Sequence, residues 1–194
     1  INNTLFKKIS NCIPGTYLSI KNGAIATHTY YDINQEGNQT IAKKEAKNAL
    51  ENALKKSVAS QMISDVKLGS QLSGGVDSSL VSYYAAKALA NGNLKTISIV
   101  FKDPRFSEEK YIDIVAKELS LQSHKYEMEA DYYFAVLEKA IWHFEQPLNH
   151  PNTIGIYLLS QEAKKHVTVL LSGEGADESL AGYSRFIRAT QFPY

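Results

Sequence analysis

A short turn beginning at Ser73 reads Ser-Gly-Gly-Val-Asp-Ser and combines groups that bind phosphate. Gly74 and Gly75 lack a Cβ, so backbone N–H groups can face a polyanion there, and the helix expected next adds its positive N-terminal end. The hydroxyls of Ser73 and Ser78 can donate to phosphate oxygens, and Asp77 can hold magnesium. The turn therefore predicts binding of ATP and chemistry at its phosphates.

A P-loop and a plain glycine turn are the alternatives at this position. The sequence contains no G-x-x-x-x-G-K-[ST] pattern, which excludes the P-loop of kinases and GTPases. In the plain glycine turn, Asp77 and Ser78 would only cap the helix that follows. Because the pattern specifies five positions and rarely arises by chance, we expect the phosphate-binding turn.

A second unusual loop, residues 172–178, reads Ser-Gly-Glu-Gly-Ala-Asp-Glu. It does not fit a dinucleotide-binding turn, because Glu178 stands where the third glycine would be, and a carboxylate suits a metal better than pyrophosphate. An acidic helix start, stabilised by the helix dipole, would account for Asp177 and Glu178. It does not account for Glu174 between two glycines.

From residue 40 onward, segments of helical period alternate with short β-branched runs. The expected helices lie at residues 40–62, 77–90, 107–119, 131–144 and 153–166, and the expected strands at 67–72, 95–101, 123–128 and 167–171. This alternation predicts an α/β fold, a parallel twisted sheet with helices on both faces. Both unusual loops begin where a strand ends, and ligands of such sheets bind at the carboxyl ends of the strands.

The N-terminal segment has a different pattern. Asn22-Gly23 suits a two-residue hairpin between strands at 16–20 and 24–31, and polar residues 34–40 are typical of a linker. A hairpin alone is marginally stable, so it is expected to belong to a sheet completed elsewhere. We therefore divide the chain into residues 1–35, which end one domain, and residues 36–194, which begin another.

Composition restricts the class of protein. With 194 residues, 44% apolar content, 21% charged content and a net charge of +1, the chain has no bias toward nucleic acid or a membrane surface. Its one cysteine, Cys12, excludes a disulfide framework and is expected to be small and buried. The sequence has no apolar span and no signal-peptide pattern, which favours a cytoplasmic protein. The start at Ile1 and the end at Tyr194 suggest a piece of a longer chain.

Together the two loops resemble the synthetase domain of glutamine-hydrolysing asparagine synthetases, members of the PP-loop ATP pyrophosphatases. NAD and GMP synthetases share the first signature, whereas residues 171–178 followed by Gly182-Tyr183 are similar to a pattern more specific to asparagine synthetases. The resemblance runs from about residue 40 to residue 183. Upstream, Ile13-Pro14-Gly15 and Tyr30-Tyr31-Asp32 look like the last strands of that family's glutaminase domain.

The sequence also departs from the family. The glutaminase nucleophile is an N-terminal cysteine, so Cys12 is not that nucleophile. Lys67 and Gln71 replace a proline and an aliphatic residue usual before the first loop, and Ser107 replaces a frequent aspartate. The family's C-terminal half, with basic residues for pyrophosphate and part of the aspartate pocket, would lie beyond Tyr194. These gaps bear on the activity of this piece alone.

The resemblance implies a two-step reaction and assigns residues to it. Aspartate would be activated by ATP as β-aspartyl-AMP with release of pyrophosphate, and ammonia, derived from glutamine, would then form asparagine. Asp77 and Asp177 would hold Mg²⁺. Glu174 would act catalytically, either by orienting the substrate ammonium or by taking a proton from ammonia. The remaining ATP-binding residues are Gln71, Leu72, Ser73, Gly74, Gly75, Ser78, Ile99, Ser172 and Gly173.

Several points stay open at the level of sequence. The protein could be a relative that uses adenylation otherwise, such as a β-lactam synthetase, a peptide cyclase or a surface-polysaccharide amidotransferase. It could instead be a non-catalytic nucleotide-binding module. Glu145 is either near the pocket or a plain surface carboxylate. A homodimer and a glutaminase domain in the same full-length chain are the expected partners, with no nucleic acid and no membrane.

Overall fold

The computed structural model describes residues 3–33, 40–89, 93–147, 150 and 152–191. By contacts between Cα atoms the chain divides into residues Ile1–Glu45 and Ala46–Tyr194, called unit 1 and unit 2, and each is considered separately. The predicted linker, residues 34–40, falls almost entirely outside the described residues. The predicted boundary at residue 35 therefore stays a prediction.

Unit 1 contains the expected hairpin. Strands β1 (Thr16–Lys21) and β2 (Ala24–Thr29) pair antiparallel, with Lys21 opposite Ala24. Asn22 and Gly23 both have positive φ, as a two-residue hairpin turn requires. The expectation that Cys12 is buried was wrong, because its side chain is exposed.

Unit 2 is an α/β fold, as predicted. Its helices and strands, in chain order, are α1 (Lys43–Gln61), which begins just before the unit, β3 (Leu68–Gln71), α2 (Val76–Ala88), β4 (Lys95–Val100), α3 (Glu109–Glu118), β5 (Gln122–Glu127), α4 (Ala130–Ala135), α5 (Leu137–Phe144), α6 (Asn152–Ala163), β6 (Val169–Leu171), α7 (Ala176–Leu180) and α8 (Ser184–Gln191). The four strands pair in parallel in the order β5-β4-β3-β6.

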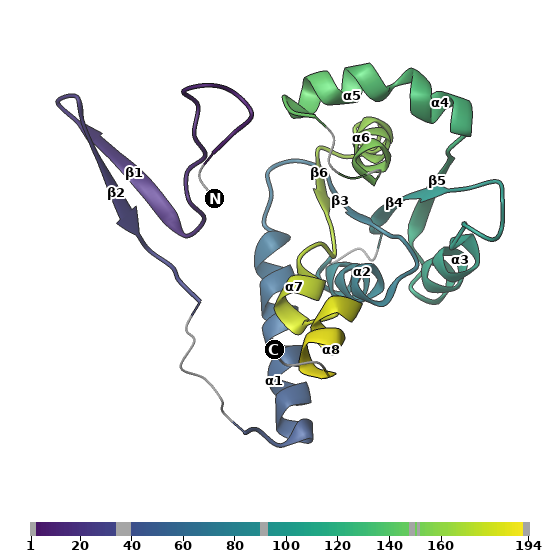
Figure 1. Ribbon diagram of the computed structural model, residues 1–194. Helices are drawn as coiled ribbons and strands as arrows, with labels where there is room; N and C mark the ends of the chain where they lie inside the picture. The colour runs from purple at the N-terminus through teal and green to yellow at the C-terminus, as the bar shows by residue number, and fades with distance from the viewer. Residues whose placement is uncertain (1–2, 34–39, 90–92, 148–149, 151, 192–194) are drawn as a thin grey trace. The chain divides into compact units, whose positions relative to one another are not determined.

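Helices cover both faces of this sheet, because apolar side chains alternate along the strands (Figure 1). On one face Ile97 of β4 packs with Leu159 and Ala163 of α6. On the other, Val100 packs with Ile112 and Ala116 of α3. Helices α1 and α2 cover that second face near β6, through Val58, Ala85 and Leu171.

One expected helix is divided in two. The pattern predicts a single helix over residues 131–144, but Val136 separates α4 from α5. Its backbone, with φ −98° and ψ −1°, leaves regular helical geometry. The Val136 side chain is buried with Ala140, Ile154 and Leu158. The helix is therefore interrupted at a β-branched residue that packs into the core.

Residues 91–93, predicted to stop α2, lie outside the described residues except for Asn93. In the part of the chain that the structure describes, no helix has both the length and the apolar character needed to cross a lipid bilayer.

Candidate nucleotide-binding site

The sheet reverses its direction of growth between β3 and β6. From β3 the chain proceeds to β4 and β5 on one side, whereas β6 pairs with β3 on the other, with Ser70 opposite Leu171. In open α/β sheets, ligands bind at such a reversal, outside the carboxyl ends of the strands. The two segments that leave these ends, each including the first turn of the helix that follows, are residues 72–78, the first loop, and residues 172–178, the second loop.

The first loop is held by its own hydroxyls. Ser78 Oγ accepts a hydrogen bond from the Ser73 backbone N–H (3.1 Å) and lies 2.9 Å from Ser73 Oγ. Gly74 has φ +89°, and a Cβ there would lie 3.0 Å from Tyr111 Cβ, so glycine is required both by conformation and by close packing on α3. The loop is thus preorganised at the start of α2, with backbone groups at a helix N-terminus.

Gly173 brings the second loop against the first. A Cβ at Gly173 would lie 2.9 Å from the backbone nitrogen of Ser78 and 3.1 Å from Asp77 Cβ. Any larger residue would push the two loops apart. The glycine is therefore explained by close approach to α2, which the sequence pattern did not reveal.

Between the loops lies a small pocket of about 120 Å³, the acidic pocket. Its lining residues are Gln71, Ser73, Asp77, Ser78, Gly173, Glu174, Gly175, Ala176, Asp177, Glu178 and Tyr183. Among the described residues, no hydrogen bond or ion pair engages the carboxylates of Asp77, Glu174 or Asp177. Their oxygens are therefore free to bind a cation of the kind that prefers oxygen ligands.

Asp77 could have been a helix cap, but it lies two residues beyond the N-cap position of α2. The N-cap position of α2 is Gly75, and no side chain caps the helix by a hydrogen bond. Asp77 lies in the first turn of α2, where the helix dipole stabilises an anion. Within the described residues no group of three or more His, Cys, Asp or Glu side chains is arranged around one metal position. The pair Asp77 and Asp177 nevertheless lines one pocket from two loops.

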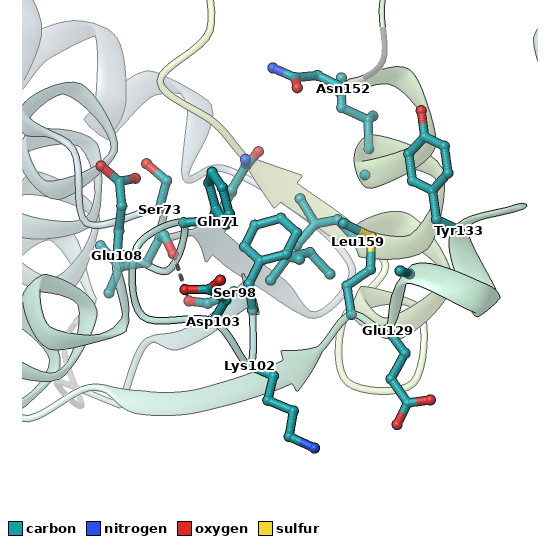
Figure 2. Close-up of a pocket in the computed structure, with 18 of the residues that line it drawn as sticks. Gln71, Ser73, Ser98, Lys102, Asp103, Glu108, Glu129, Tyr133, Asn152 and Leu159 are labelled. Carbon is teal, nitrogen blue, oxygen red and sulfur yellow. Dashed lines mark hydrogen bonds between the residues drawn. The ribbon is translucent and has the colours of Figure 1, made fainter.

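A larger cavity of about 950 Å³, the aromatic cavity, adjoins the acidic pocket, since Gln71, Ser73 and Glu174 line both. Its walls are largely apolar and include Ile99, Phe101, Phe106, Met128, Tyr133, Phe134, Ile156 and Leu159. Figure 2 shows Tyr133 and Asn152 on one side of it and Ser73 and Glu108 on the other, while Lys102 and Glu129 extend away. The cavity offers flat apolar surface to a ring system.

Most predicted ATP-binding residues lie at these two spaces. Ile99 and Leu72 line the aromatic cavity, and Ser73 lines both spaces. The main chain of Leu72 is already engaged, because its N–H donates to Ile97 O (3.1 Å) and its carbonyl accepts from Ser98 Oγ (2.6 Å). Leu72 is also fully buried, so it shapes the wall of the cavity from beneath.

Three other predicted residues do not line the cavity or the pocket. Gly74, Gly75 and Ser172 line neither space. Ser172 Oγ accepts from the Glu174 backbone N–H at 3.1 Å and so shapes the second loop. Glu145 is exposed at the end of α5 and lines neither space, which agrees with the alternative of a plain surface carboxylate.

Comparison with known proteins shows the family of this chain. The family model described as "Asparagine synthase" matches residues 49–193, most of the chain, including both loops and the helices between them. The chain belongs to the asparagine synthase family. The resemblance noted in the sequence is thereby confirmed.

Relatives differ in what they are named for. Asparagine synthetase [glutamine-hydrolyzing] 1 of Bacillus subtilis is 38% identical over 93% of this chain and 28% of its own length. Amidase chyE of Penicillium rubens is 27% identical over 94% of this chain and 30% of its own length. The chain thus spans less than a third of either relative. A solved ammonia-dependent NAD synthetase of Campylobacter jejuni has 16% identity and a TM-score of 0.46, over 71% of this chain and 60% of its own.

The aromatic wall of this asparagine synthase domain was missed at the level of sequence. Phe101, Phe106, Tyr133 and Phe134 were not singled out as site residues. They come from the segment after β4 and from α4, which meet only in the folded sheet. The one available signal was the cluster of aromatic residues directly after the ends of strands.

A hydrogen-bonded group closes one side of the acidic pocket. The Tyr183 hydroxyl donates to Glu178 Oε1 at 2.7 Å, which holds the pKa of the Glu178 carboxyl below its ordinary value and raises the pKa of Tyr183. The Arg185 guanidinium lies 4.4 Å from the Tyr183 ring centre. Gly182 packs so closely on Asp177 that a Cβ would overlap its carboxylate. Residues 182–185 therefore fix the acids of the second loop.

Proposed function

We propose that this chain is the ATP-activating part of an asparagine-forming enzyme. It would activate the side-chain carboxylate of aspartate as β-aspartyl-AMP and pass it to ammonia. The observation that carries the proposal is the meeting of the two loops at the reversal of the sheet, where each contributes carboxylates to one pocket. Membership of the asparagine synthase family supports the same reaction.

The two adjoining spaces suit the parts of ATP. A purine is flat and apolar on its faces, which fits the aromatic cavity, and phosphates require backbone N–H groups and cations, which fit the start of α2 and the acidic pocket. Because a nucleotide runs from base through ribose to phosphates, the residues common to both spaces would face the ribose and the α-phosphate.

Magnesium fits the acidic pocket by the chemistry of its donors. Asp77 and Asp177 would hold the ion, because Mg²⁺ prefers oxygen ligands and the two carboxylates have no partner among the described residues. When bound, the ion neutralises charge on the phosphates, which lets an anionic nucleophile approach.

In the first step, an oxygen of the aspartate side-chain carboxylate would form a bond to the α-phosphorus. The bond from that phosphorus to the oxygen bridging to the β-phosphorus would break, and pyrophosphate would leave. In the second step, ammonia would attack the acyl carbon, AMP would leave, and one proton would be lost from nitrogen. Ser73, Ser78 and the N-terminus of α2 would hold the phosphates in line.

Glu174 lines both spaces, and its carboxylate has no partner among the described residues. In the proposed reaction the activated carboxyl group of β-aspartyl-AMP would lie beside it. It would either bind the ammonium of the amino-acid substrate or accept the proton lost from ammonia. Both roles need an ionised carboxylate at this junction. The glutaminase domain, the homodimer and the cytoplasmic location stay predictions for the full-length protein.

The test is the release of pyrophosphate by the full-length protein with Mg²⁺ and ATP. We expect release that depends on aspartate, and asparagine when ammonium is added. A second candidate is an amide-forming enzyme with another carboxylate, since one relative bears a name other than asparagine synthetase. AMP formation that ignores aspartate and responds to another carboxylic acid would favour that candidate. ADP as the product would refute both.

A further inference from the structure

Gln71 occupies the junction between the aromatic cavity and the acidic pocket. It is the last residue of β3, it is half-buried, and it lines both spaces together with Ser73 and Glu174. Among the described residues its side-chain amide forms no hydrogen bond. A glutamine amide carries two donors and one acceptor, so this position presents hydrogen-bonding capacity that the fold itself leaves unused.

The strand directs this amide toward the ligand spaces. Neighbouring residues on a strand point to opposite faces of a sheet. Ser70 lies on the face covered by α2, where its hydroxyl is 3.0 Å from that of Ser82, and Gln71 lies on the face of the cavity. Figure 2 shows the Gln71 side chain among the lining residues of the cavity.

An apolar side chain would serve equally well as a wall at this position of a largely apolar cavity. A half-buried amide without a partner loses hydrogen bonds to water unless a ligand replaces them. The chemistry of Gln71 therefore indicates a polar, uncharged group of the ligand at the junction. Resting on the proposed function, that group is the sugar, which lies between base and phosphates.

We infer that the Gln71 amide hydrogen-bonds a ribose hydroxyl of ATP, so that the site discriminates ribonucleotides from deoxyribonucleotides. Ribose hydroxyls both donate and accept, which matches an amide with both capacities. One neutral hydrogen bond of this kind corresponds to about a 3- to 10-fold change in affinity. Gln71 would thus be a specificity-determining residue, with no proton or bond of the reaction passing through it.

The experiment measures dissociation constants of Mg-ATP, Mg-2′-deoxy-ATP and Mg-3′-deoxy-ATP by calorimetry on the full-length protein, without aspartate. We expect the wild-type protein to bind ATP about 3- to 10-fold more tightly than at least one deoxy analogue. Gln71→Met should weaken ATP binding to the level of that analogue and leave binding of the analogue unchanged. Gln71→Leu provides a second apolar variant should methionine disturb folding.

The matched control is Gln61→Met, at the exposed end of α1, where the same change removes only a hydrogen bond to Ser57. It should leave all three affinities unchanged. Equal affinity of the wild-type protein for all three nucleotides would overturn the inference, as would a preference retained in both Gln71 variants. With aspartate-dependent pyrophosphate release intact, such results would leave the proposed function standing. Absence of ATP binding would refute both.

Discussion

Gly173 of the second loop lies directly against Asp77 at the start of α2. A Cβ at Gly173 would lie 3.0 Å from the carbonyl carbon of Asp77 and 3.1 Å from its Cβ. This contact joins the segments after β3 and β6, and it determines how closely the carboxylates of the two loops approach. Loss of the contact should therefore affect binding of metal and nucleotide.

We predict that Gly173→Ala weakens Mg-ATP binding by at least about tenfold. The added methyl group contacts backbone atoms of Ser78 and Asp77, which cannot move without moving α2. Calorimetric titration with Mg-ATP checks this. Wild-type affinity in this variant would show that the spacing of the loops is not important.

Gly155→Ala in α6 serves as a comparison for stability alone, because a Cβ there meets nothing within 4 Å while Gly155 lines the aromatic cavity. Because alanine favours the helix over glycine, we expect the free energy of unfolding to rise by about 0.5–1 kcal/mol. Urea unfolding of the Gly173 and Gly155 variants compares the two sites. The methyl group lies in a tight contact at residue 173 and meets nothing within 4 Å at residue 155.

Asp77→Asn and Asp177→Asn should each raise the Mg²⁺ concentration needed for half-maximal ATP binding by about tenfold or more. Each change removes one anionic oxygen ligand while keeping the shape of the side chain. Asp65→Asn, in an exposed loop outside both spaces, is the control. If ATP binding by the Asp77 variant keeps its original dependence on Mg²⁺, Asp77 does not hold the ion.

Much of the site could be predicted because its signals are local. The glycine turn after β3 and the acids after β6 are contiguous in sequence, and the rule that loops gather at the carboxyl end of a parallel sheet brings Asp77 and Asp177 together. The adjacency of β3 and β6 themselves depends on strand order, which periodicity does not encode.

Other features depend on tertiary packing. Phe106 follows β4, and Tyr133 lies in α4, which follows β5. The two residues line one cavity because β4 and β5 are neighbours in the sheet. The break at Val136 is a further example, since helical periodicity continues through it while burial against Ile154 accompanies the end of α4. Close approach at Gly173 likewise has no signature beyond glycine itself.

The buried pair Ser70 and Ser82 should contribute to stability. Their hydroxyl oxygens lie 3.0 Å apart between β3 and α2, and both side chains are fully buried. Ser82→Ala should lower the free energy of unfolding by about 1–2 kcal/mol, since it leaves Ser70 with only a weak bond to its neighbour's carbonyl. The double change to alanine should cost less than the sum of the single changes, as urea unfolding would reveal; additive losses would contradict this coupling.

His124 should make unit 2 sensitive to acid. Burial lowers its pKa, helped by the neighbouring His166, whose ring stacks at 3.8 Å between centroids, and by Lys95. The unfolded chain therefore binds a proton more readily than the folded one. The stability that neutral His124 contributes is complete above pH 6.5, the ordinary pKa of histidine. It is lost as the pH falls through the lowered pKa of the folded state. His124→Phe should flatten this dependence in urea unfolding between pH 7.5 and 5; an unchanged slope would argue otherwise.

The central claim, attack of the aspartate carboxylate on the α-phosphorus, is tested most directly by isotope transfer. The full-length protein would be incubated with Mg-ATP, ammonium and aspartate labelled with ¹⁸O in its side-chain carboxylate, and the AMP analysed by mass spectrometry. The account predicts one ¹⁸O atom in each AMP molecule, because the oxygen that bonds to phosphorus leaves with AMP. Unlabelled AMP, or label in inorganic phosphate alongside ADP, would contradict it.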